Sequence, residues 1–506
     1  MALGLVFFQN FLGLQVQLPV ELRQPLGDIL MHRGFADAEL MGRLPHGGFI
    51  FYDVQGEVAG SLLQVFDDAH HPPVIFPRYP MWGRRKKVRK IDIGAAGSYN
   101  EPQKHFLETE DFDMPQLSKR VDTFTDSVIR RMTRISDETP GSINLSQGFP
   151  DFDPPQILLE AMREMSGGGE QHQYPVTFGS PNLRKCIAEK YSPILGRTID
   201  PEAEVTVTCG GTEAMLCTVL AICNPGDKVI AFSPVYENYG TDAILSGAQP
   251  IYVPLVPPSY DFDRAVLEDA FRQGPKAIIV CNPSNPCGKV FTREELEYIV
   301  GLAEKYDAYV ITDEVYEHIV FPPHVHTMAA ALPGAYERVI TCNSLSKTFS
   351  ITGWRLGFVI AEPEVSEYIK KVHDFTTIGA PAPLQEAVCK AFALGQDYYD
   401  DMLKTYSRKR DIFCGGLAEI GLPHTVPQGS YFVMVDISAF LAKEKFAGWT
   451  DLEFCEWMVK EVGVAAVPGS SFFAEPVNHL IRLHFARSEE SRREAVRRLG
   501  MLKKYL

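Results

Sequence analysis

The chain has 506 residues, of which 45% are hydrophobic and 22% are charged, close to the averages of globular proteins. This length exceeds the size of a single hydrophobic core, so we expect more than one domain. The net charge of -15 argues against a general affinity for nucleic acid or for anionic membranes. These bulk properties favour a multidomain protein that acts on small molecules.

The first 117 residues differ from the rest of the chain in their pattern of apolar and charged residues. No Lys or Arg precedes the apolar stretch near the start, and no run reaches the roughly 20 apolar residues of a membrane span, so neither a signal peptide nor a span is expected. Residues 48–66 predict two β-like runs around Gln55-Gly56. A basic run, Arg84–Lys90, is followed by polar, acidic sequence. We therefore expect an N-terminal extension with β content over residues 1–117.

Beyond Ser118 the sequence alternates between β-like and α-like segments, which predicts a mostly parallel sheet covered by helices. A helix is expected from Glu213 to Ile222, and a second begins at a capping box formed by Thr292 and Glu295. Polar clusters follow the predicted strands, and ligands in such sheets bind at the carboxyl ends of strands. The strands, predicted as short apolar runs rich in β-branched residues, are 204–208, 228–232, 277–281 and 309–312.

The most specific pattern runs from Ser344 to Gly357 and reads Ser-Leu-Ser-Lys-Thr-Phe-Ser-Ile-Thr-Gly-Trp-Arg-Leu-Gly. It resembles the cofactor-lysine signature of class I/II aminotransferases, which are pyridoxal-5′-phosphate (PLP) enzymes of fold type I. The resemblance implies that Lys347 carries the cofactor as a Schiff base. Ser344, Ser346 and Arg355 are then expected to hold the phosphate, since a dianion needs hydroxyls and a cation. A solvated loop lysine is the alternative for an isolated Lys, but the flanking pattern favours the cofactor site.

Residues Thr312–Tyr316 resemble the Asp-Glu-x-Tyr element of the same family. By that match Asp313 pairs with the protonated pyridine nitrogen, and Tyr316 hydrogen-bonds the phenolic oxygen of the ring. A carboxylate against the nitrogen keeps the ring cationic and makes it an electron sink. An isolated Asp at a strand end more often caps a turn. Together with Lys347, these two residues form the expected catalytic set.

Residues Asn282–Gly288 are similar to the Asn-Pro-x-Asn-Pro-Thr-Gly loop of the family, with Cys287 in place of the usual Thr. The resemblance implies that Asn285 contacts both the ring oxygen and the substrate carboxylate. A proline-rich turn with Asx hydrogen bonds is the structural alternative. We expect this loop to lie at the site because it follows a predicted strand.

Two further loops lie between a predicted strand and a helix. The backbone N–H groups of Gly210, Gly211 and Thr212 are expected to bind the phosphate at the helix N-terminus. Tyr236 stands where the family has an aromatic residue that stacks on the pyridine ring, whereas an ordinary core tyrosine is the alternative. Both loops therefore add to the expected cofactor site.

Three residues concern the substrate and the partner subunit. Arg482 matches the arginine that grips the α-carboxylate, although an arginine on a half-buried strand could instead form an ordinary ion pair. Gly148 matches the loop where backbone approaches the substrate. Tyr174 matches the tyrosine that reaches the phosphate of a neighbouring subunit. The resemblance therefore implies a homodimer with shared sites.

The resemblance runs from about residue 118 to the end of the chain. It implies an N-terminal arm with part of the small domain over residues 118–165, a large PLP-binding domain over 166–400 and a small α/β domain over 401–506. All ten cysteines lie from Cys186 onward without paired CxxC spacing, which favours a reducing, cytoplasmic location. No metal-ligand spacing accompanies the histidines, so no metal site is expected.

These patterns predict a PLP-dependent aminotransferase that moves an amino group from an L-amino acid to a 2-oxo acid by a ping-pong mechanism. Neutral or aromatic donors are favoured, because Thr212 follows the glycine pair where some aspartate-using relatives have Lys. Fold and cofactor do not select the reaction, so a C–S β-lyase, an aminocyclopropane-carboxylate synthase-like enzyme and a decarboxylase stay open. A PLP-sensing transcription regulator is a more distant alternative, since no helix-turn-helix pattern precedes residue 90.

Overall fold

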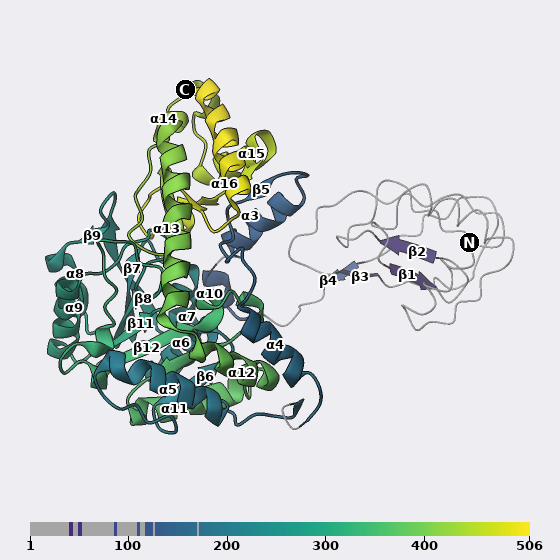
Figure 1. The fold of residues 1–506 in the computed structure, drawn as a ribbon. Helices are drawn as coiled ribbons and strands as arrows, with labels where there is room; N and C mark the ends of the chain where they lie inside the picture. The colour runs from purple at the N-terminus through teal and green to yellow at the C-terminus, as the bar shows by residue number, and fades with distance from the viewer. Residues whose placement is uncertain are drawn as a thin grey trace, which may run out of the picture. The chain divides into compact units, whose positions relative to one another are not determined.

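The structure is a computed structural model that describes residues 117–124, 127–169 and 172–506, together with four short strands before them (Figure 1). The chain divides into two compact units, Met1–Leu117 and Ser118–Leu506. The predicted turn at Gln55-Gly56 lies outside the described residues. The first unit contains two antiparallel strand pairs, β1 (Leu40–Arg43) with β2 (Phe49–Tyr52) and β3 (Lys86–Val88) with β4 (Thr109–Asp111).

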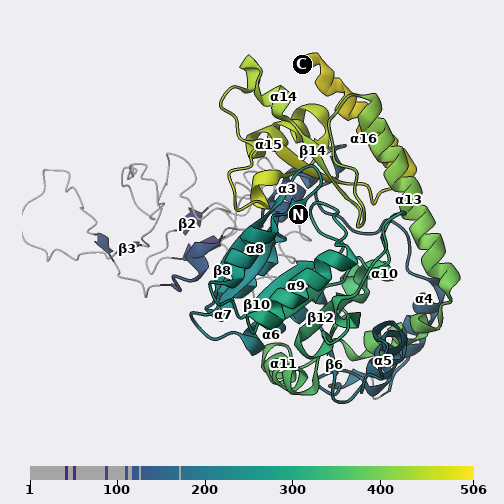
Figure 2. The same cartoon turned by 90° about the vertical axis from the view of Figure 1, so that its left-hand side faces the viewer.

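An eight-stranded sheet lies at the centre of the second unit, in the order β6-β13-β12-β11-β10-β7-β8-β9 (Figures 1 and 2). The neighbouring pairs from β12 to β8 are all parallel, and only the pairs that involve β13 or β9 are antiparallel. The prediction of a mostly parallel sheet is confirmed, and the four predicted strands agree to within one residue. The strands are β6 (Val205–Thr208), β7 (Lys228–Ser233), β8 (Gln249–Val256), β9 (Asp261–Phe262), β10 (Ala277–Cys281), β11 (Tyr309–Asp313), β12 (Val339–Ser344) and β13 (Gly357–Ile360).

Helices cover both faces of this sheet, as expected for strands that are apolar on both sides. The predicted capping box opens α9, where Thr292 Oγ1 accepts from the Glu295 N–H and the Glu295 carboxylate accepts from the Thr292 N–H. One face packs against α6 (Gly211–Ile222), α7 (Glu237–Ser246) and α11 (Pro363–Thr376). The other face packs against α4 (Gln156–Met165), α5 (Pro181–Leu195), α8 (Arg264–Phe271), α9 (Arg293–Lys305) and α12 (Ala382–Cys389).

A separate hydrophobic core lies in the C-terminal part of the unit, built on a three-stranded antiparallel sheet. The long helix α13 (Gln396–Glu419) runs from the large sheet to this C-terminal part of the unit (Figure 1). Its side chains pack against both this core and the core of the large sheet. The strands of the three-stranded sheet are β14 (Phe432–Asp436), β17 (Leu480–His484) and β16 (Val467–Pro468). Nearby, β15 (Val464–Ala465) pairs with β5 (Ile143–Asn144). The other helices that pack on this core are α3 (Val128–Asp137), α14 (Ser438–Leu441), α15 (Asp451–Val462) and α16 (Glu489–Leu499).

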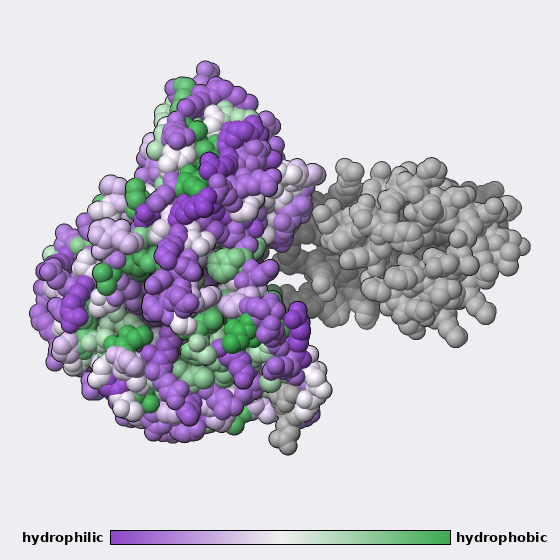
Figure 3. All heavy atoms as spheres, viewed as in Figure 1, coloured by the Kyte–Doolittle hydropathy of each residue, from purple (hydrophilic) through white to green (hydrophobic). Residues whose placement is uncertain are grey.

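The face of residues 118–506 seen in Figure 3 carries hydrophilic residues interspersed with smaller apolar areas. Within the described part of the chain, none of the helices has both the length and the hydropathy required to cross a bilayer.

Asp242 of α7 is a buried carboxylic acid whose Oδ2 has no hydrogen-bond partner among the described residues. Burial raises the pKa of Asp242 to about 8. The unfolded chain releases this proton near pH 4, so the folded state loses stability as pH rises from about 4 to about 8. We expect Asp242→Asn to increase the free energy of unfolding by about 1–3 kcal/mol at pH 8 and by less at pH 5. Urea unfolding at the two pH values measures this, and a difference that is independent of pH would contradict it.

Candidate active site

The carboxyl ends of five strands meet along one edge of the large sheet. Strands β12, β11, β10 and β7 are parallel, and β6 has the same direction because β13 runs antiparallel to both β6 and β12. Polar segments from distant parts of the sequence are therefore brought to one edge. The predicted residues that follow or end these strands are Gly210, Gly211 and Thr212 after β6, Tyr236 after β7, Asn285 after β10, Asp313 in β11, and Ser344, Ser346 and Lys347 at the end of β12.

Lys347 lies in the short helix α10 (Leu345–Thr348), which follows β12 directly. Its Nζ donates to the carbonyl oxygen of Gly148 at 3.4 Å and lies 5.8 Å from the ring centroid of Tyr431. In the described part of the chain, the amine thus contacts a carbonyl and an aromatic face, and not a carboxylate. This arrangement leaves the lysine available for covalent chemistry.

Asp313 ends β11, and each of its two carboxylate oxygens accepts a hydrogen bond. Oδ2 accepts from the Tyr239 hydroxyl at 2.6 Å, and Oδ1 accepts from the Val315 N–H at 3.2 Å. Burial raises the pKa of this carboxyl group, although both hydrogen bonds and the charge of Lys347 oppose the rise. A cation placed against Asp313 would offset the cost of burial, so the group suits a protonated ring nitrogen.

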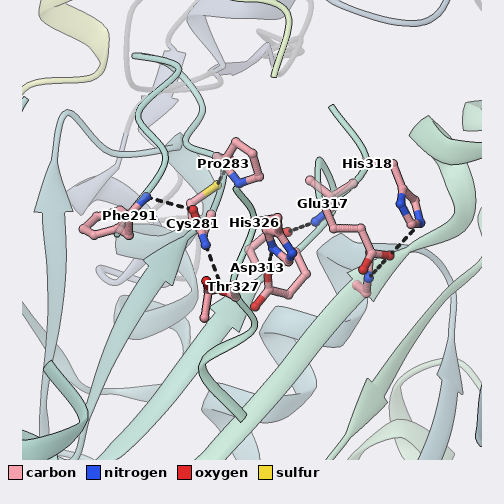
Figure 4. Close-up of polar contacts among 12 residues, drawn as sticks. Cys281, Pro283, Phe291, Asp313, Glu317, His318, His326 and Thr327 are labelled. Atoms are coloured by element: carbon pink, nitrogen blue, oxygen red, sulfur yellow. Dashed lines mark hydrogen bonds and ion pairs between the residues drawn. The ribbon is translucent and has the colours of Figure 1, made fainter. Parts of the chain in front are cut away.

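The end of β11 is fixed by buried polar contacts around Asp313 (Figure 4). Glu314 accepts from His326 Nε2 at 2.7 Å, and Glu317 accepts from Asn343 Nδ2 at 2.9 Å. Asn343 lies near the end of β12. The second contact therefore joins the turn that follows β11 to the strand that precedes the lysine.

Tyr316 is buried one turn beyond Asp313, with its ring edge-on to Tyr431 at 5.2 Å and to Phe432 at 5.9 Å between centroids. Burial raises the pKa of the Tyr316 phenol well above its ordinary value. The phenol therefore stays protonated and can donate a hydrogen bond at neutral pH.

The start of α6 has the features of an anion site. Gly210 has φ of +81° at the N-cap and provides no capping side chain, so the first N–H groups of the helix lack a side-chain acceptor. A Cβ at Gly210 would lie 2.5 Å from Arg355 Nη2, which shows how closely backbone and guanidinium approach. Arg355 donates only to carbonyl oxygens in the described residues, those of Thr352 and Cys209.

Two hydroxyls complete this region. Ser344 Oγ donates to Ser346 Oγ at 2.8 Å and accepts from the Ser346 N–H at 3.2 Å. Both serines are buried at the start of α10, and Gly211 packs against Ser344. Thr212, in contrast, is exposed in the first turn of α6. Hydroxyls, open N–H groups and a cation together fit a dianionic phosphate.

Arg482 of β17 is 1% exposed and forms no ion pair with a described carboxylate. Its Nη1 donates to Asn285 Oδ1 at 2.8 Å, its Nη2 donates to the Ser146 carbonyl at 2.7 Å, and its Nε is buried without a described partner. The guanidinium lies over the rings of Phe432 and Phe472, with its Cζ 4.3 and 4.7 Å from their centroids. Burial lowers the pKa of Arg482 to about 10. A buried guanidinium with only neutral partners suits a carboxylate ligand.

Gly148 joins the lysine to the C-terminal core. Its carbonyl oxygen accepts from the Tyr431 hydroxyl at 3.0 Å as well as from Lys347. A Cβ at Gly148 would lie 2.6 Å from Tyr431 Cε2 and 2.9 Å from Phe432 Cε1. Only glycine fits this close approach.

Tyr236 is the N-cap residue of α7, and its half-buried ring lies edge-on to Tyr239 at 5.6 Å between centroids. Burial raises the pKa of Tyr236 to about 12.

Tyr174 differs from the other predicted residues, because its side chain is 82% exposed in a loop that packs against Gly379.

The sequence patterns did not identify Tyr239 or Tyr431. Tyr239 lies in the first turn of α7, three residues after the N-cap residue Tyr236, and the two rings are in contact. This helical spacing is the signal that could have identified it. Tyr431 lies shortly after the Pro427–Gly429 turn and has no comparable local signal.

Three comparisons place the chain among known proteins. The family model for aminotransferases of class I and II matches residues 140–499. Human kynurenine–oxoglutarate transaminase 1 is 36% identical over 375 residues, which cover 69% of this chain and 89% of that protein. Methionine aminotransferase of Escherichia coli K12 is 35% identical over 362 residues, which cover 71% and 92%. The structure of N-succinyldiaminopimelate aminotransferase from Mycobacterium tuberculosis superposes with a TM-score of 0.72 at 34% identity, covering 76% of this chain and all of that one.

The fold agrees with these comparisons, since the solved relatives are aminotransferases and the match extends over the large sheet and the C-terminal core. The predicted family, cofactor and enzyme class are confirmed. The chain therefore belongs to the class I and II aminotransferases and is a PLP-dependent transferase.

Proposed function

We propose that this aminotransferase takes its amino group from neutral or aromatic L-amino acids and passes it to a 2-oxo acid. The observation that carries the proposal is Arg482, a buried guanidinium in contact with two aromatic rings and with no carboxylate partner among the described residues. The rings favour an apolar or aromatic neighbour for the bound α-carboxylate. Relatives named for kynurenine and for methionine support this substrate class.

We assign the cofactor contacts by combining the family resemblance with the strand-end geometry. PLP supplies an electron-withdrawing ring that stabilises the charge left on the substrate Cα. Lys347 would hold the cofactor through its amine, and Asp313 would pair with the ring nitrogen. Tyr316 and Asn285 would hydrogen-bond the ring oxygen, while Tyr236 would stack on the ring. The phosphate contacts are the N–H groups of Gly210, Gly211 and Thr212, the hydroxyls of Ser344 and Ser346, the Arg355 guanidinium and Tyr174 of a second subunit.

The side chains have separate roles in the proposed reaction. Arg482 and Asn285 hold the substrate carboxylate, which fixes the Cα next to Lys347. The Lys347 amine, released when the amine of the substrate takes its place on the cofactor, would remove the Cα proton as a general base and then return a proton as a general acid. The Gly148 carbonyl and the Tyr431 ring fix the position of that amine.

We also infer that the enzyme works as a homodimer. Four exposed apolar side chains lie in two segments that meet where Pro175 packs against Gly379. Such a surface is best covered by a second copy, since Tyr174 is the residue expected to reach the neighbouring phosphate. Light scattering should give about twice the mass of 56.5 kDa. The exposed residues are Tyr174, Val176, Phe375 and Ile378.

The expected domain division is also proposed, with an arm and part of the small domain in residues 118–165, the large domain in 166–400 and the small domain in 401–506. In support, α3 and β5 pack with the C-terminal core. Helix α4, in contrast, packs on the large sheet. We further propose a cytoplasmic location, which the ten free cysteines support.

A donor panel tests the proposed substrate class. Purified enzyme with PLP and 2-oxoglutarate should turn over kynurenine, phenylalanine and methionine with kcat/KM at least about tenfold above that of aspartate, since one unmatched charge in an apolar site costs more than about 1.4 kcal/mol. A preference for aspartate would overturn the assignment. Release of pyruvate and a thiol from a cysteine conjugate, without transfer of the amino group to 2-oxoglutarate, would favour a lyase.

Gly148→Ala tests the role of the substrate loop. The added methyl group meets Tyr431 and Phe432 at less than 3 Å, so the loop must move away from Lys347. A shift of about 1 Å lowers kcat/KM by about 100-fold. Gly301→Ala is the control, because a Cβ at Gly301 in α9 meets nothing within 4 Å. Equal steady-state kinetics for the two variants would refute the role of Gly148.

A further inference from the structure

Tyr239 is a buried tyrosine of α7 whose side chain reaches the end of β11. Its side chain is 4% exposed, and its hydroxyl donates to Asp313 Oδ2 at 2.6 Å. This distance is typical of a short, charge-assisted O–H···O⁻ hydrogen bond. The two residues are separated by 74 positions in the sequence, so the contact depends on how α7 packs against the sheet.

The two hydrogen bonds of Asp313 fix the plane of its carboxylate. The Val315 N–H binds Oδ1 as part of the local turn, whereas the Tyr239 hydroxyl binds Oδ2 from a different element. Without the hydroxyl, Oδ2 would lose a donor in a region where burial already disfavours the charged form. A carboxyl group that takes up a proton can no longer act as a counter-ion.

We propose that Tyr239 is a positioning residue, whose hydroxyl orients Asp313 and keeps its carboxylate ionised for the pyridine nitrogen of the cofactor. The inference deepens the proposed function and depends on its assignment of Asp313. Tyr239 touches neither substrate nor cofactor in this assignment and acts through Asp313 alone.

The direction of two pKa shifts agrees with this role. Burial raises the pKa of the Tyr239 phenol well above its ordinary value, so the phenol keeps its proton and donates. Burial raises the pKa of Asp313, and the Tyr239 hydroxyl is the largest influence that lowers it again. Removing the hydroxyl should therefore favour the neutral carboxylic acid.

Tyr239→Phe tests the proposal, because it removes only the oxygen and keeps the edge-to-face contact with Tyr236. A hydrogen bond to a charged group contributes roughly 1.5–3 kcal/mol, so the PLP dissociation constant should rise by about 10- to 100-fold. The value of kcat should fall in the same range, whereas KM for the amino donor should change less than about threefold, because Arg482 is untouched.

Tyr260→Phe is the matched control. Tyr260 is 2% exposed in the same unit, and its hydroxyl has no hydrogen-bond partner among the described residues. Removal of an unpaired buried hydroxyl should leave kcat and PLP binding unchanged. If Tyr239→Phe also leaves both unchanged, the proposal is wrong.

A double-mutant cycle with Asp313→Asn separates positioning from packing. If Tyr239 acts through Asp313, adding Tyr239→Phe to Asp313→Asn should raise the PLP dissociation constant less than about threefold. An equal rise in both backgrounds would mean a packing role and would overturn the proposal. Should Tyr239→Phe fail to fold, restoration of folding by Asp313→Asn supports the pairing, and failure to restore it contradicts the pairing.

The outcome can be distinguished from failure of the proposed function. The wild-type protein should bind PLP and show the visible absorption of the lysine-bound cofactor, and Lys347→Ala should not. If the wild type fails this test, the assignment of the site is wrong. If it passes and the cycle shows no coupling, only the role of Tyr239 is rejected.

Discussion

Lys347→Ala is expected to lower kcat for amino transfer by about 10⁴-fold or more. In the proposed assignment the variant loses both the amine that holds the cofactor and the group that moves the Cα proton, and the acid–base part alone contributes about 10²- to 10⁴-fold. The fold should be unaffected, because the amine contacts only a carbonyl and a ring face within the described part of the chain. Steady-state transamination and the visible absorption spectrum of the PLP-loaded protein measure the two losses.

Lys443→Ala serves as the control for this prediction, since Lys443 is exposed in the C-terminal part of the chain. It should retain wild-type kcat and the wild-type spectrum. If Lys347→Ala keeps substantial transamination activity and the absorption spectrum of the wild type, another amine carries the cofactor. The assignment of Lys347 would then have to be abandoned.

Arg482→Lys is expected to reduce kcat/KM for amino donors by about 10²- to 10³-fold, chiefly through a higher KM. Lysine keeps the charge but loses the planar fork that can bind a carboxylate with two parallel hydrogen bonds. It also leaves Asn285 and the Ser146 carbonyl without the donors that now reach them at 2.8 and 2.7 Å. PLP binding should be retained, because Arg482 is assigned to the substrate and not to the cofactor.

The control for the arginine is Arg264→Lys. Arg264 is exposed and lies 4.8 Å from the ring centroid of Tyr298, so it reproduces an arginine–aromatic contact away from the site. Its KM for donors should equal that of the wild type. If Arg482→Lys binds donors as tightly as the wild type, some other residue must hold the carboxylate.

The strands of the large sheet were predictable because their signal is local. Short apolar β-branched runs such as Ala277–Cys281 are buried on both faces, and polar residues begin where each run stops. The direction of β13 was not predictable in this way. Its sequence, Gly357–Ile360, is as apolar as its parallel neighbours, and its antiparallel course depends on how the chain returns from Lys347 to the position between β12 and β6.

The site was predicted in part for the same reason. Lys347 and Asp313 lie in contiguous segments whose composition is distinctive, so the family resemblance identifies them. The hydrogen bond of Tyr239 joins residues that are 74 positions apart in the sequence, and that of Tyr431 joins residues that are 283 positions apart. The chain has 20 tyrosines, and no local pattern tells which of them will face a given backbone carbonyl or carboxylate. Only tertiary packing selects those two.

The spacing of Tyr236 and Tyr239 on α7 limits how this enzyme can change. Insertion or deletion of one residue between them would rotate one tyrosine by about 100° relative to the other. A rigid displacement of α7, in contrast, would move both tyrosines together. If Tyr236 stacks on the cofactor ring as proposed, movement of the helix alters the stacking residue and the hydrogen-bond donor of Asp313 together. Only a side-chain substitution then changes one of these contacts alone.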